Sequence, residues 1–277
     1  MNISVAICTY NGERFLRQQL DSIARQTLLP DELVACDDDS SDTTIKVLGE
    51  FARRVSFSVQ IHKNDHNLGS TKNFEKAISL CSGTNIFLSD QDDIWKPNKI
   101  ETLSRALAEH PEVGYVFSDA ELTDQSLQPL GCRLWDSIGF QNEIRSKFNS
   151  EEQFYLLVEK NVVTGATLAF RSQIAKRAMP FPESWVHDSW LALISSATKA
   201  PGLPIDEPLI FYRQHAAQQI GTISELAEKN KTLTRMYQDL KNHHQAQFAD
   251  WEKRCRRIIK LKETLSRLFA DDPGLVP

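Results

Sequence analysis

The sequence predicts an α/β fold, with a mostly parallel sheet flanked by helices and a helical extension at the C-terminal end. Strand-like apolar runs and amphipathic helical segments alternate strictly through the first half of the chain. Short polar clusters follow several of the strand-like runs, and beyond about Ile223 the apolar spacing becomes purely helical. Strict alternation is typical of βαβ units with right-handed crossovers, which place successive strands in parallel.

The elements of the first half are bounded by turn and breaker residues. An apolar run over 3–8 ends at the turn around Gly12, and the helical pattern over 13–26 is broken at Pro30. The other elements expected in this half are strands over 33–36, 55–61, 85–88 and 113–118, and helices over 43–53, 71–80 and 97–110.

The second half is less regular and is punctuated by prolines. The elements expected there are a helix over 152–159, a turn and strand over 162–170, a helix over 191–197 opened by 185–190, and a strand over 203–212. We therefore expect one α/β domain over 1–221 and a helical extension over 222–277.

Composition limits the class of protein. The 277 residues are 41% hydrophobic and 25% charged, as in an ordinary soluble globular protein. A net charge of −5 argues against a general nucleic-acid binder. The five cysteines are scattered without a paired motif, which favours reduced core residues and a cytoplasmic protein. The sequence contains no run of about 18 consecutive apolar residues, so we expect no membrane-spanning helix.

Three aspartates within four positions follow the strand-like run 85–88: Asp90, Asp92 and Asp93. Two unit charges about 4 Å apart repel by roughly 4 kcal/mol at an effective dielectric constant of ~20. Carboxylate oxygens suit Mg²⁺ or Mn²⁺, which bind through one or two carboxylates plus substrate phosphates. One interpretation is a site for a metal and a diphosphate. The other is an acidic turn with capping aspartates.

Two more polar clusters follow strand-like runs, at 9–11 and 37–39. Ligands of open parallel sheets bind beyond the carboxyl ends of the strands. Each cluster alone is compatible with turn chemistry. Three clusters at one edge of a sheet favour a ligand cleft.

Six motifs occur in order along the chain. They are Ile7-Cys8-Thr9-Tyr10-Asn11-Gly12, Asp37-Asp38-Asp39-Ser40-Ser41-Asp42-Thr43-Thr44, Asn67-Leu68-Gly69 with Lys72-Asn73, Asp90-Gln91-Asp92-Asp93-Ile94-Trp95, His187-Asp188, and Tyr212-Arg213-Gln214-His215. With these motifs the chain resembles the family 2 glycosyltransferases of GT-A fold, particularly the bacterial rhamnosyltransferases of polysaccharide synthesis. The resemblance covers roughly Ile3 to Gly221.

The resemblance implies roles for individual residues. The residues implied to bind the donor nucleotide or its diphosphate are Thr9, Tyr10, Asn11, Asp37, Asp38, Lys72, Asp90 and Gln91. Those implied to hold Mg²⁺ or Mn²⁺ are Asp90, Asp92 and His215, the first two forming a DXD motif. Asp188 is implied to be the catalytic base. The residues implied to lie near the acceptor are Gly165, Ala166, Trp95, His187 and Trp190.

The chain departs from the family pattern at three positions. Asp39 stands where glycine is frequent, so we expect an altered second loop. His187 replaces the usual Glu before the base, which leaves open which group orients that base. Lys72 replaces a frequent Arg and loses bidentate phosphate geometry.

The residue chemistry agrees with the implied reaction. A metal would neutralise the leaving diphosphate as a Lewis acid. A single base opposite the leaving group implies direct displacement with inversion. Asp188 precedes a helical segment, so it could serve as that base or simply cap the helix. His215 could be a ligand or an ordinary surface histidine.

The expected function is therefore an inverting, metal-dependent glycosyltransferase that builds a cell-surface glycan. Rhamnose from a dTDP-rhamnose donor is favoured by analogy, with a UDP-hexose as the main competitor and a saccharide or lipid-linked saccharide as acceptor. A non-catalytic nucleotide-sugar-binding or scaffold module is the alternative. A dinucleotide-dependent oxidoreductase is disfavoured because no loop carries GxGxxG.

The last part of the chain carries a basic amphipathic pattern. Between Trp251 and Leu268 there are seven basic and two acidic residues. Such a helix could dock on anionic lipid as a peripheral contact at the inner face of the cell membrane. It could equally pack against the main domain or a second subunit, with a solvated basic face.

Overall fold

The structure is a computed structural model that describes residues 2–149, 152–215, 218, 260–267 and 270. The chain divides into two compact units, which we call the main unit (Met1–Arg213) and the second unit (Gln214–Val276). The predicted boundary at 221 and most of the predicted extension over 222–277 lie outside the described residues. Within the basic stretch 251–268 the structure describes residues 260–267, and all of them are helical.

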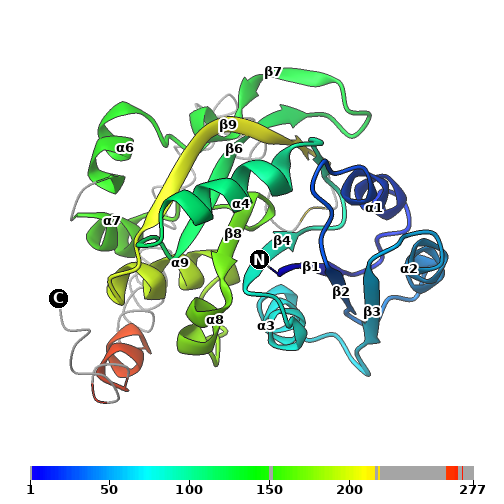
Figure 1. The fold of residues 1–277 in the computed structure, drawn as a ribbon, viewed down its shortest axis with the longest axis horizontal. Coiled ribbons are helices and arrows are strands. Elements are labelled where there is room, and N and C mark those ends of the chain that lie inside the picture. Colours follow the sequence, from blue (N-terminus) through cyan, green and yellow to red (C-terminus); the bar gives the residue numbers. More distant parts are fainter. Residues whose placement is uncertain (1, 150–151, 216–217, 219–259, 268–269, 271–277) are drawn as a thin grey trace, which may run out of the picture. The chain divides into compact units, whose positions relative to one another are not determined.

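The main unit is built on a nine-stranded sheet with the order β3-β2-β1-β4-β8-β6-β9-β5, and β7 pairs with β6 (Figure 1). The first four strands in this order pair in parallel, as the alternating pattern predicts. These strands are β1 (Ile3–Thr9), β2 (Glu32–Asp37), β3 (Ser58–Lys63) and β4 (Asn85–Ser89). Beyond them the sheet is mixed.

The mixed part corrects the prediction of a mostly parallel sheet. β8 lies antiparallel between β4 and β6, while β6 and β9 are parallel to each other. β8 follows the short 3-10 turn Gly165–Thr167, which packs against β4. The remaining strands are β5 (Ile94–Trp95), β6 (Tyr115–Thr123), β7 (Pro129–Arg133), β8 (Leu168–Arg171) and β9 (Gly202–Arg213).

Helices cover both faces of the sheet. In Figure 1, α1 and α2 lie together on one side, and α3, α8 and α9 lie together on the other, while α4 packs on β6, β8 and β9. This division follows from right-handed crossovers, because the chain reverses direction across the sheet between β3 and β4. The helices are α1 (Leu16–Ala24), α2 (Thr44–Ala52), α3 (Ser70–Leu80), α4 (Lys99–Glu109), α5 (Leu134–Ser137), α6 (Asn142–Phe148), α7 (Gln153–Glu159), α8 (Ser172–Ala178) and α9 (His187–Ala197).

The core explains why the strands read as unbroken apolar runs. All residues of β1, β2 and β4 are buried, because helices cover the sheet on both faces. Full burial of each large apolar side chain contributes about 1.5–3 kcal/mol. Among the described helices, none is both long and apolar enough to cross a membrane.

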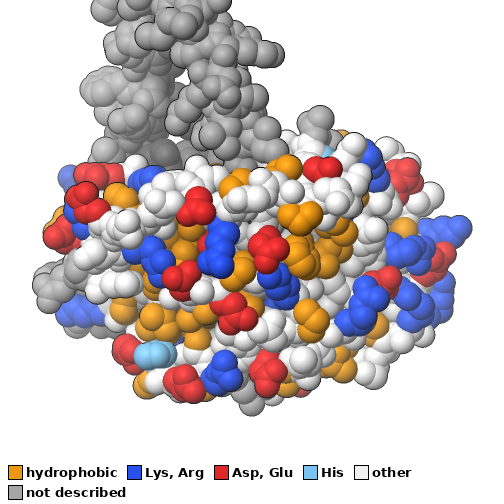
Figure 2. Space-filling view, turned by 90° about the horizontal axis from the view of Figure 1, so that it is seen from above, with side chains coloured by type: hydrophobic (Ala, Val, Ile, Leu, Met, Phe, Trp, Pro, Cys, Tyr) orange, Lys and Arg blue, Asp and Glu red, His pale blue; other side chains and the backbone are white. Residues whose placement is uncertain are grey.

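The surface mixes charges of both signs. On the face in Figure 2, the end that carries α1 and α2 shows Lys and Arg side chains interspersed with Asp and Glu. Two ion pairs join these helices, Arg17–Glu50 at 2.6 Å and Arg54–Asp21 at 3.0 Å. Exposed pairs of this kind contribute at most about 1 kcal/mol each, so they secure the two helices only weakly.

Candidate active site

The carboxyl ends of three parallel strands meet at one edge of the sheet. Thr9 pairs with Asp37 across β1 and β2, and Ile7 pairs with Ser89 across β1 and β4. The loops that follow therefore emerge side by side. This register brings together the three polar clusters on which the prediction of a cleft rests.

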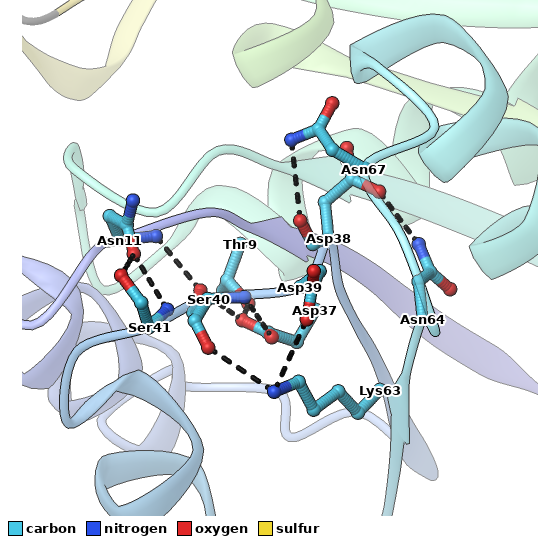
Figure 3. Close-up of polar contacts among 10 residues, drawn as sticks. All are labelled: Thr9, Asn11, Asp37, Asp38, Asp39, Ser40, Ser41, Lys63, Asn64 and Asn67. Carbon is cyan, nitrogen blue, oxygen red and sulfur yellow. Dashed lines mark hydrogen bonds and ion pairs between the residues drawn. The ribbon is translucent and has the colours of Figure 1, made fainter.

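Asp37 is the last residue of β2 and is completely buried, and both of its carboxylate oxygens accept hydrogen bonds (Figure 3). One oxygen accepts a hydrogen bond from the Ser40 backbone at 2.9 Å. The other accepts from the hydroxyls of Thr9, at 2.8 Å, and Ser40. The implied nucleotide-binding residues Thr9 and Asp37 thus bind each other. In this conformation they shape the loop from inside.

Asp38 is also saturated. Its carboxylate accepts hydrogen bonds from the Asn64 side chain and the Leu68 backbone, both at 2.8 Å, and from the Gly69 backbone at 2.9 Å. It thereby ties the loop after β2 to the loop that opens α3. Any contact of Asp38 with a nucleotide would compete with three charge-assisted hydrogen bonds.

Asp39 occupies the position in the second loop where glycine is frequent in the family. Its φ is +65°, so the loop keeps the left-handed conformation that glycine adopts readily. The Asp39 carboxylate lies 3.4 Å from the Lys63 ammonium, which also donates to the Ser40 carbonyl (Figure 3). The side chain therefore extends the loop's polar network without changing the backbone region.

The first loop is locked to the acidic loop by Gln91. Its amide donates to the Tyr10 carbonyl at 3.0 Å and accepts from the Tyr10 backbone at 2.9 Å. Gly12 makes room for this contact, because a Cβ there would lie 2.2 Å from the Gln91 side-chain oxygen. Asn11 joins the loop after β2, accepting from the Ser41 backbone at 2.9 Å. The Tyr10 side chain stays 50% exposed at this edge.

The acidic loop after β4 is electrostatically strained. Burial, then Asp92 and Asp188, raise the pKa of Asp90 to about 7. Burial, then Asp92 and Asp90, raise the pKa of Asp93 well above its usual range. Asp93 accepts a hydrogen bond from the Arg213 backbone at 3.0 Å, but its other oxygen is buried without a hydrogen-bond partner. The Lys99 ammonium opposes both shifts but does not outweigh burial and the mutual repulsion of the carboxylates.

The loop fits a divalent cation. Among the described residues, no three His, Cys, Asp or Glu side chains converge as a complete metal site. Mg²⁺ needs only one or two carboxylates when substrate phosphates supply further oxygens, and Asp90 and Asp92 offer that number. One buried oxygen of Asp93 has no hydrogen-bond partner. His215 lies in the second unit, and its role as a ligand stays a prediction.

Asp188 opens α9 on the other side of the cleft-forming loops. Its carboxylate accepts from the Gly165 backbone at 2.8 Å, the Ser189 backbone at 2.5 Å and the Asn161 side chain at 3.3 Å. These hydrogen bonds fix the orientation of the Asp188 carboxylate, and its role as the catalytic base stays a prediction. A side chain at Gly165 would collide here, since a Cβ would lie 2.8 Å from a ring nitrogen of His187.

His187 is buried and stacks on Phe74, with ring centroids 3.9 Å apart. Neither of its ring nitrogens has a hydrogen-bond partner. Burial lowers its pKa, so the imidazole is neutral near pH 7. A neutral imidazole beside Asp188 and Gly165 can donate one hydrogen bond and accept another.

Three residues of the implied site are engaged in contacts within the protein. Trp190 is fully buried and donates to the Ala178 carbonyl at 2.8 Å, so it packs in the core. Trp95 is 2% exposed and faces the ammonium of Lys99. The Lys72 ammonium binds Glu75 and the Phe181 carbonyl, both at 2.6 Å, and so links α3 to the segment before α9.

The sequence analysis assigned no role to two cationic residues that are buried in the structure, Arg213 and Lys99. Arg213 is 2% exposed and donates to the Asp92 carbonyl at 2.6 Å. Lys99 is completely buried and donates to the Ala166 carbonyl at 2.6 Å. A signal for Lys99 was present, because it shares the apolar face of its helix with Leu103 and Leu107.

A separate polar cavity of about 330 Å³ lies among β6, α5, α6 and β9. Two arginines in it bind the same carboxylate: Arg145 lies 3.0 Å and Arg133 3.6 Å from Asp206. The cavity is lined by Asp119, Arg133, Trp135, Asp136, Phe140, Gln141, Asn142, Arg145 and Asp206. Its charges largely balance one another, unlike those of the acidic loop.

Comparisons with known proteins agree with this geometry. The family model described as glycosyl transferase family 2 matches residues 4–177. The dTDP-rhamnosyl transferase RfbG of Shigella flexneri is 27% identical over 242 residues, covering 82% of this chain and 78% of RfbG. The chain spans 59% of the length of uncharacterised Mycobacterium proteins that it matches at 25% identity.

Two solved structures share the fold. Staphylococcus aureus TarS, in complex with UDP-GlcNAc, superposes with a TM-score of 0.60 at 17% identity, covering 79% of this chain and 60% of TarS. The mannosyltransferase PcManGT of Pyrobaculum calidifontis, with GDP-Man and Mn²⁺, gives a TM-score of 0.56 at 19% identity, covering 80% of this chain and 59% of PcManGT. The prediction of a GT-A fold is confirmed.

Proposed function

The chain belongs to glycosyl transferase family 2, and from this premise we propose that it transfers a sugar from a nucleoside-diphosphate donor to a saccharide or lipid-linked saccharide acceptor, with inversion. One observation carries the proposal. The acidic loop after β4 brings carboxylates with raised pKa values to the sheet edge where nucleotide ligands of such folds bind. A bound cation and diphosphate would complete that loop.

The residues divide into two groups around the reacting centre. On the donor side, Tyr10 offers an exposed aromatic ring to a base, and Asp90 and Asp92 would hold Mg²⁺ or Mn²⁺ on the diphosphate. When bound, that cation would neutralise the charge that develops on the leaving group. On the acceptor side, Asp188 would remove the proton of the attacking hydroxyl.

Asp188 is oriented for this role by the Gly165 backbone and Asn161. His187, with both ring nitrogens unpartnered, would bind an acceptor or donor hydroxyl beside it. A single base on one face of the sugar leads to direct displacement, so we expect inversion at the anomeric carbon. No second carboxylate is needed as a nucleophile.

For the donor, dTDP-rhamnose is favoured because RfbG, which covers most of this chain, is named a dTDP-rhamnosyl transferase. A UDP-hexose is the competitor, since TarS carries UDP-GlcNAc. The reaction would build a cell-surface glycan from the cytoplasmic side. Residues 222–277 would contact the inner membrane surface, where a lipid-linked acceptor is held.

The decisive experiment is a donor screen followed by a transfer assay. Thermal shifts with dTDP-rhamnose, UDP-glucose and UDP-GlcNAc are measured with Mn²⁺ and with EDTA. We expect a shift with one donor that requires the metal. Transfer should be lost in Asp92→Ala and Asp188→Ala, and unchanged turnover in both would overturn the site. Metal-dependent nucleotide binding without turnover on any acceptor would instead indicate a non-catalytic module.

A further inference from the structure

The polar cavity among β6, α5, α6 and β9 takes no part in the proposed chemistry. Its volume of about 330 Å³ falls at the lower end of the range for small-molecule sites, about 300–1,000 Å³. Along β9, Asp206 at the cavity and Arg213 at the acidic loop are seven residues apart. A strand advances about 3.3 Å per residue, so the cavity lies roughly 20 Å from that loop and is a separate site.

Two charged groups of the cavity have unused hydrogen-bonding capacity. The Asp119 side chain is 3% exposed, and one of its oxygens accepts from the backbones of Ala120 and Trp135, at 2.8 and 3.0 Å. Its other oxygen lies 3.8 Å from Arg133 and accepts no hydrogen bond from a described residue. The Arg133 guanidinium likewise donates to none, because Asp206 is 3.6 Å away. Both separations are too long for a direct hydrogen bond and leave these groups open to a ligand.

Arg145 is held in a fixed orientation at the same cavity. Its guanidinium stacks on Trp135, 4.9 Å from the ring centroid, and one terminal nitrogen donates to Asp206 at 3.0 Å. A guanidinium carries five N–H donors in a rigid fork, and no other described residue accepts from this one. The cavity therefore offers preoriented donors and acceptors to the same space.

The charges of the lining do not favour an ion. The guanidiniums of Arg133 and Arg145 face three carboxylates, those of Asp119, Asp136 and Asp206, which leaves one net negative charge. An anion would meet the carboxylates, and a metal cation would meet the guanidiniums. A hydroxyl group, in contrast, can accept from a guanidinium and donate to a carboxylate at the same time, and bonds in such a chain strengthen one another. The lining fits a neutral ligand with several hydroxyl groups, which is the chemistry of a sugar.

The wall of the cavity is joined to the acceptor side of the candidate active site. Gly139 lies in the segment between α5 and α6, next to the lining residue Phe140, and its carbonyl accepts from the Lys160 ammonium at 3.4 Å. The next residue, Asn161, donates to the carboxylate of Asp188 at 3.3 Å. Two consecutive residues thus connect the cavity wall with the proposed base.

We propose that this cavity is a second saccharide subsite, which holds a sugar unit of the acceptor at a distance from the hydroxyl that reacts. The proposal rests on the proposed function, because the ligand is taken to be the acceptor of that reaction. Arg133 and Arg145 donate to hydroxyl oxygens of the sugar, and the second oxygen of Asp119 accepts from a hydroxyl. The bound sugar unit is not altered, so the subsite contributes acceptor affinity and acceptor selection only.

The first part of the experiment locates the sugar directly. Crystals of the chain are soaked with the selenomethyl glycosides of L-rhamnose, D-glucose and N-acetyl-D-glucosamine, whose selenium atom marks the sugar in an anomalous map. We expect one of them in the cavity. The same glycosides are titrated into the chain by NMR without donor or metal, with an expected Kd of about 1–10 mM, because each hydrogen bond made in water gains little net free energy. A cavity that stays empty with all three sugars overturns the proposal.

The second part measures variants. Arg133→Met and Arg145→Met remove donors, so each should weaken glycoside binding and raise KM for the acceptor by about tenfold, while kcat and KM for the donor stay unchanged. A structural defect would instead lower kcat and the melting temperature. Arg54→Met is the matched control, because Arg54 is 50% exposed against 48% for Arg133, and it binds Asp21 at 3.0 Å as Arg145 binds Asp206. It should change none of these quantities.

The outcomes separate this proposal from the proposed function. Transfer with an unchanged acceptor KM in a folded Arg133→Met overturns the subsite and leaves the transferase function intact; a sugar seen in the crystal then reflects binding at crystal concentration only. A change in donor KM alone also overturns it. Glycoside binding that both variants lose, in a chain that transfers no sugar, overturns the transferase function and supports the saccharide site. If neither variant folds, occupancy of the cavity by the selenium-labelled sugar decides.

Discussion

Two acidic loops at the same edge of the sheet have similar sequences and opposite electrostatic states. In the loop after β2, both oxygens of Asp37 and of Asp38 accept hydrogen bonds from backbone amides or side chains. In the loop after β4, Asp93 keeps a buried oxygen without a partner, and the pKa of Asp90 is raised to about 7. The carboxylates of the first cluster are fully hydrogen-bonded within the protein, whereas those of the second are not.

The difference arises from the residues that follow each cluster. The loop after β2 continues with hydroxyl side chains, of which Ser40 binds Asp37 and Thr44 binds Asp42. The loop after β4 continues with Ile94 and Trp95, which carry no hydroxyl group, and the indole N–H of Trp95 is directed at the Gln19 amide. Clustered aspartates alone therefore do not identify a ligand site. The supply of internal donors next to them does.

The largest expected effect is on turnover. Asp92→Ala should reduce sugar transfer by about a thousandfold, equivalent to about 4 kcal/mol of transition-state stabilisation. It should leave the melting temperature unchanged or raised, because it relieves repulsion in the acidic loop. Transfer assays and thermal unfolding measure both quantities. Asp39→Asn, in the loop after β2, is the control and should retain activity, since Asn tolerates the positive φ of this position. An active Asp92→Ala would remove the distinction between the loops.

The opposite result is expected for Asp38. Asp38→Ala should lower the free energy of unfolding by about 3 kcal/mol, because it leaves the Asn64 side chain and the Leu68 and Gly69 amides without their acceptor. Urea unfolding at pH 7 measures this loss. If Asp38→Ala and Asp92→Ala changed stability equally, the two loops would not differ in the way described.

Elements that depend on local sequence patterns could be predicted, whereas those that depend on pairing between distant residues could not. The alternating pattern predicts β1 to β4 and the helices between them, because local periodicity determines each βαβ unit. It does not predict that β8 inserts antiparallel between β4 and β6, which depends on pairing between residues distant in sequence. The elements β5, β7, α5, α6 and α8 were also missed. All five residues of β7, for example, are exposed, so that strand carries no apolar pattern.

The residues of the candidate site divide in a similar way. Motif order selects Asp90, Asp92 and Asp188 as candidates, but it does not show that the Lys72 ammonium is held by Glu75 and the Phe181 carbonyl. It also does not separate exposed aromatic residues from buried ones, so Trp190 was assigned to the acceptor although it is a core residue. Burial and competing partners are properties of the folded chain, and motifs do not carry them.

A smaller effect, on the pH dependence of stability, is expected from His187, whose buried ring nitrogens also have no hydrogen-bond partner. Its pKa is lowered by burial, so the unfolded chain takes up a proton near pH 6.5 while the folded chain does not. Stability should therefore fall as the pH drops below about 6.5, by at most about 1.4 kcal/mol per pH unit. Urea midpoints at pH 7.5 and 5.5 measure this slope. His187→Gln should lose that part of the pH dependence, and an unchanged slope would show that the folded imidazole titrates normally.

The smallest effect tests the contact that joins the first loop to the acidic loop. Gly12→Ala places a Cβ within 2.2 Å of the Gln91 side-chain oxygen, so Gln91 must leave the Tyr10 backbone. Because the displaced amide is the far end of a flexible side chain, we expect little loss of stability and about a fivefold rise in KM for the donor. Gly49→Ala in α2 is the matched control: its nearest neighbour is 3.9 Å away, and alanine should stabilise the helix by about 0.5–1 kcal/mol without changing KM. An equal KM for the donor in both variants would mean that the Gln91 contact is not needed to hold the first loop against the acidic loop.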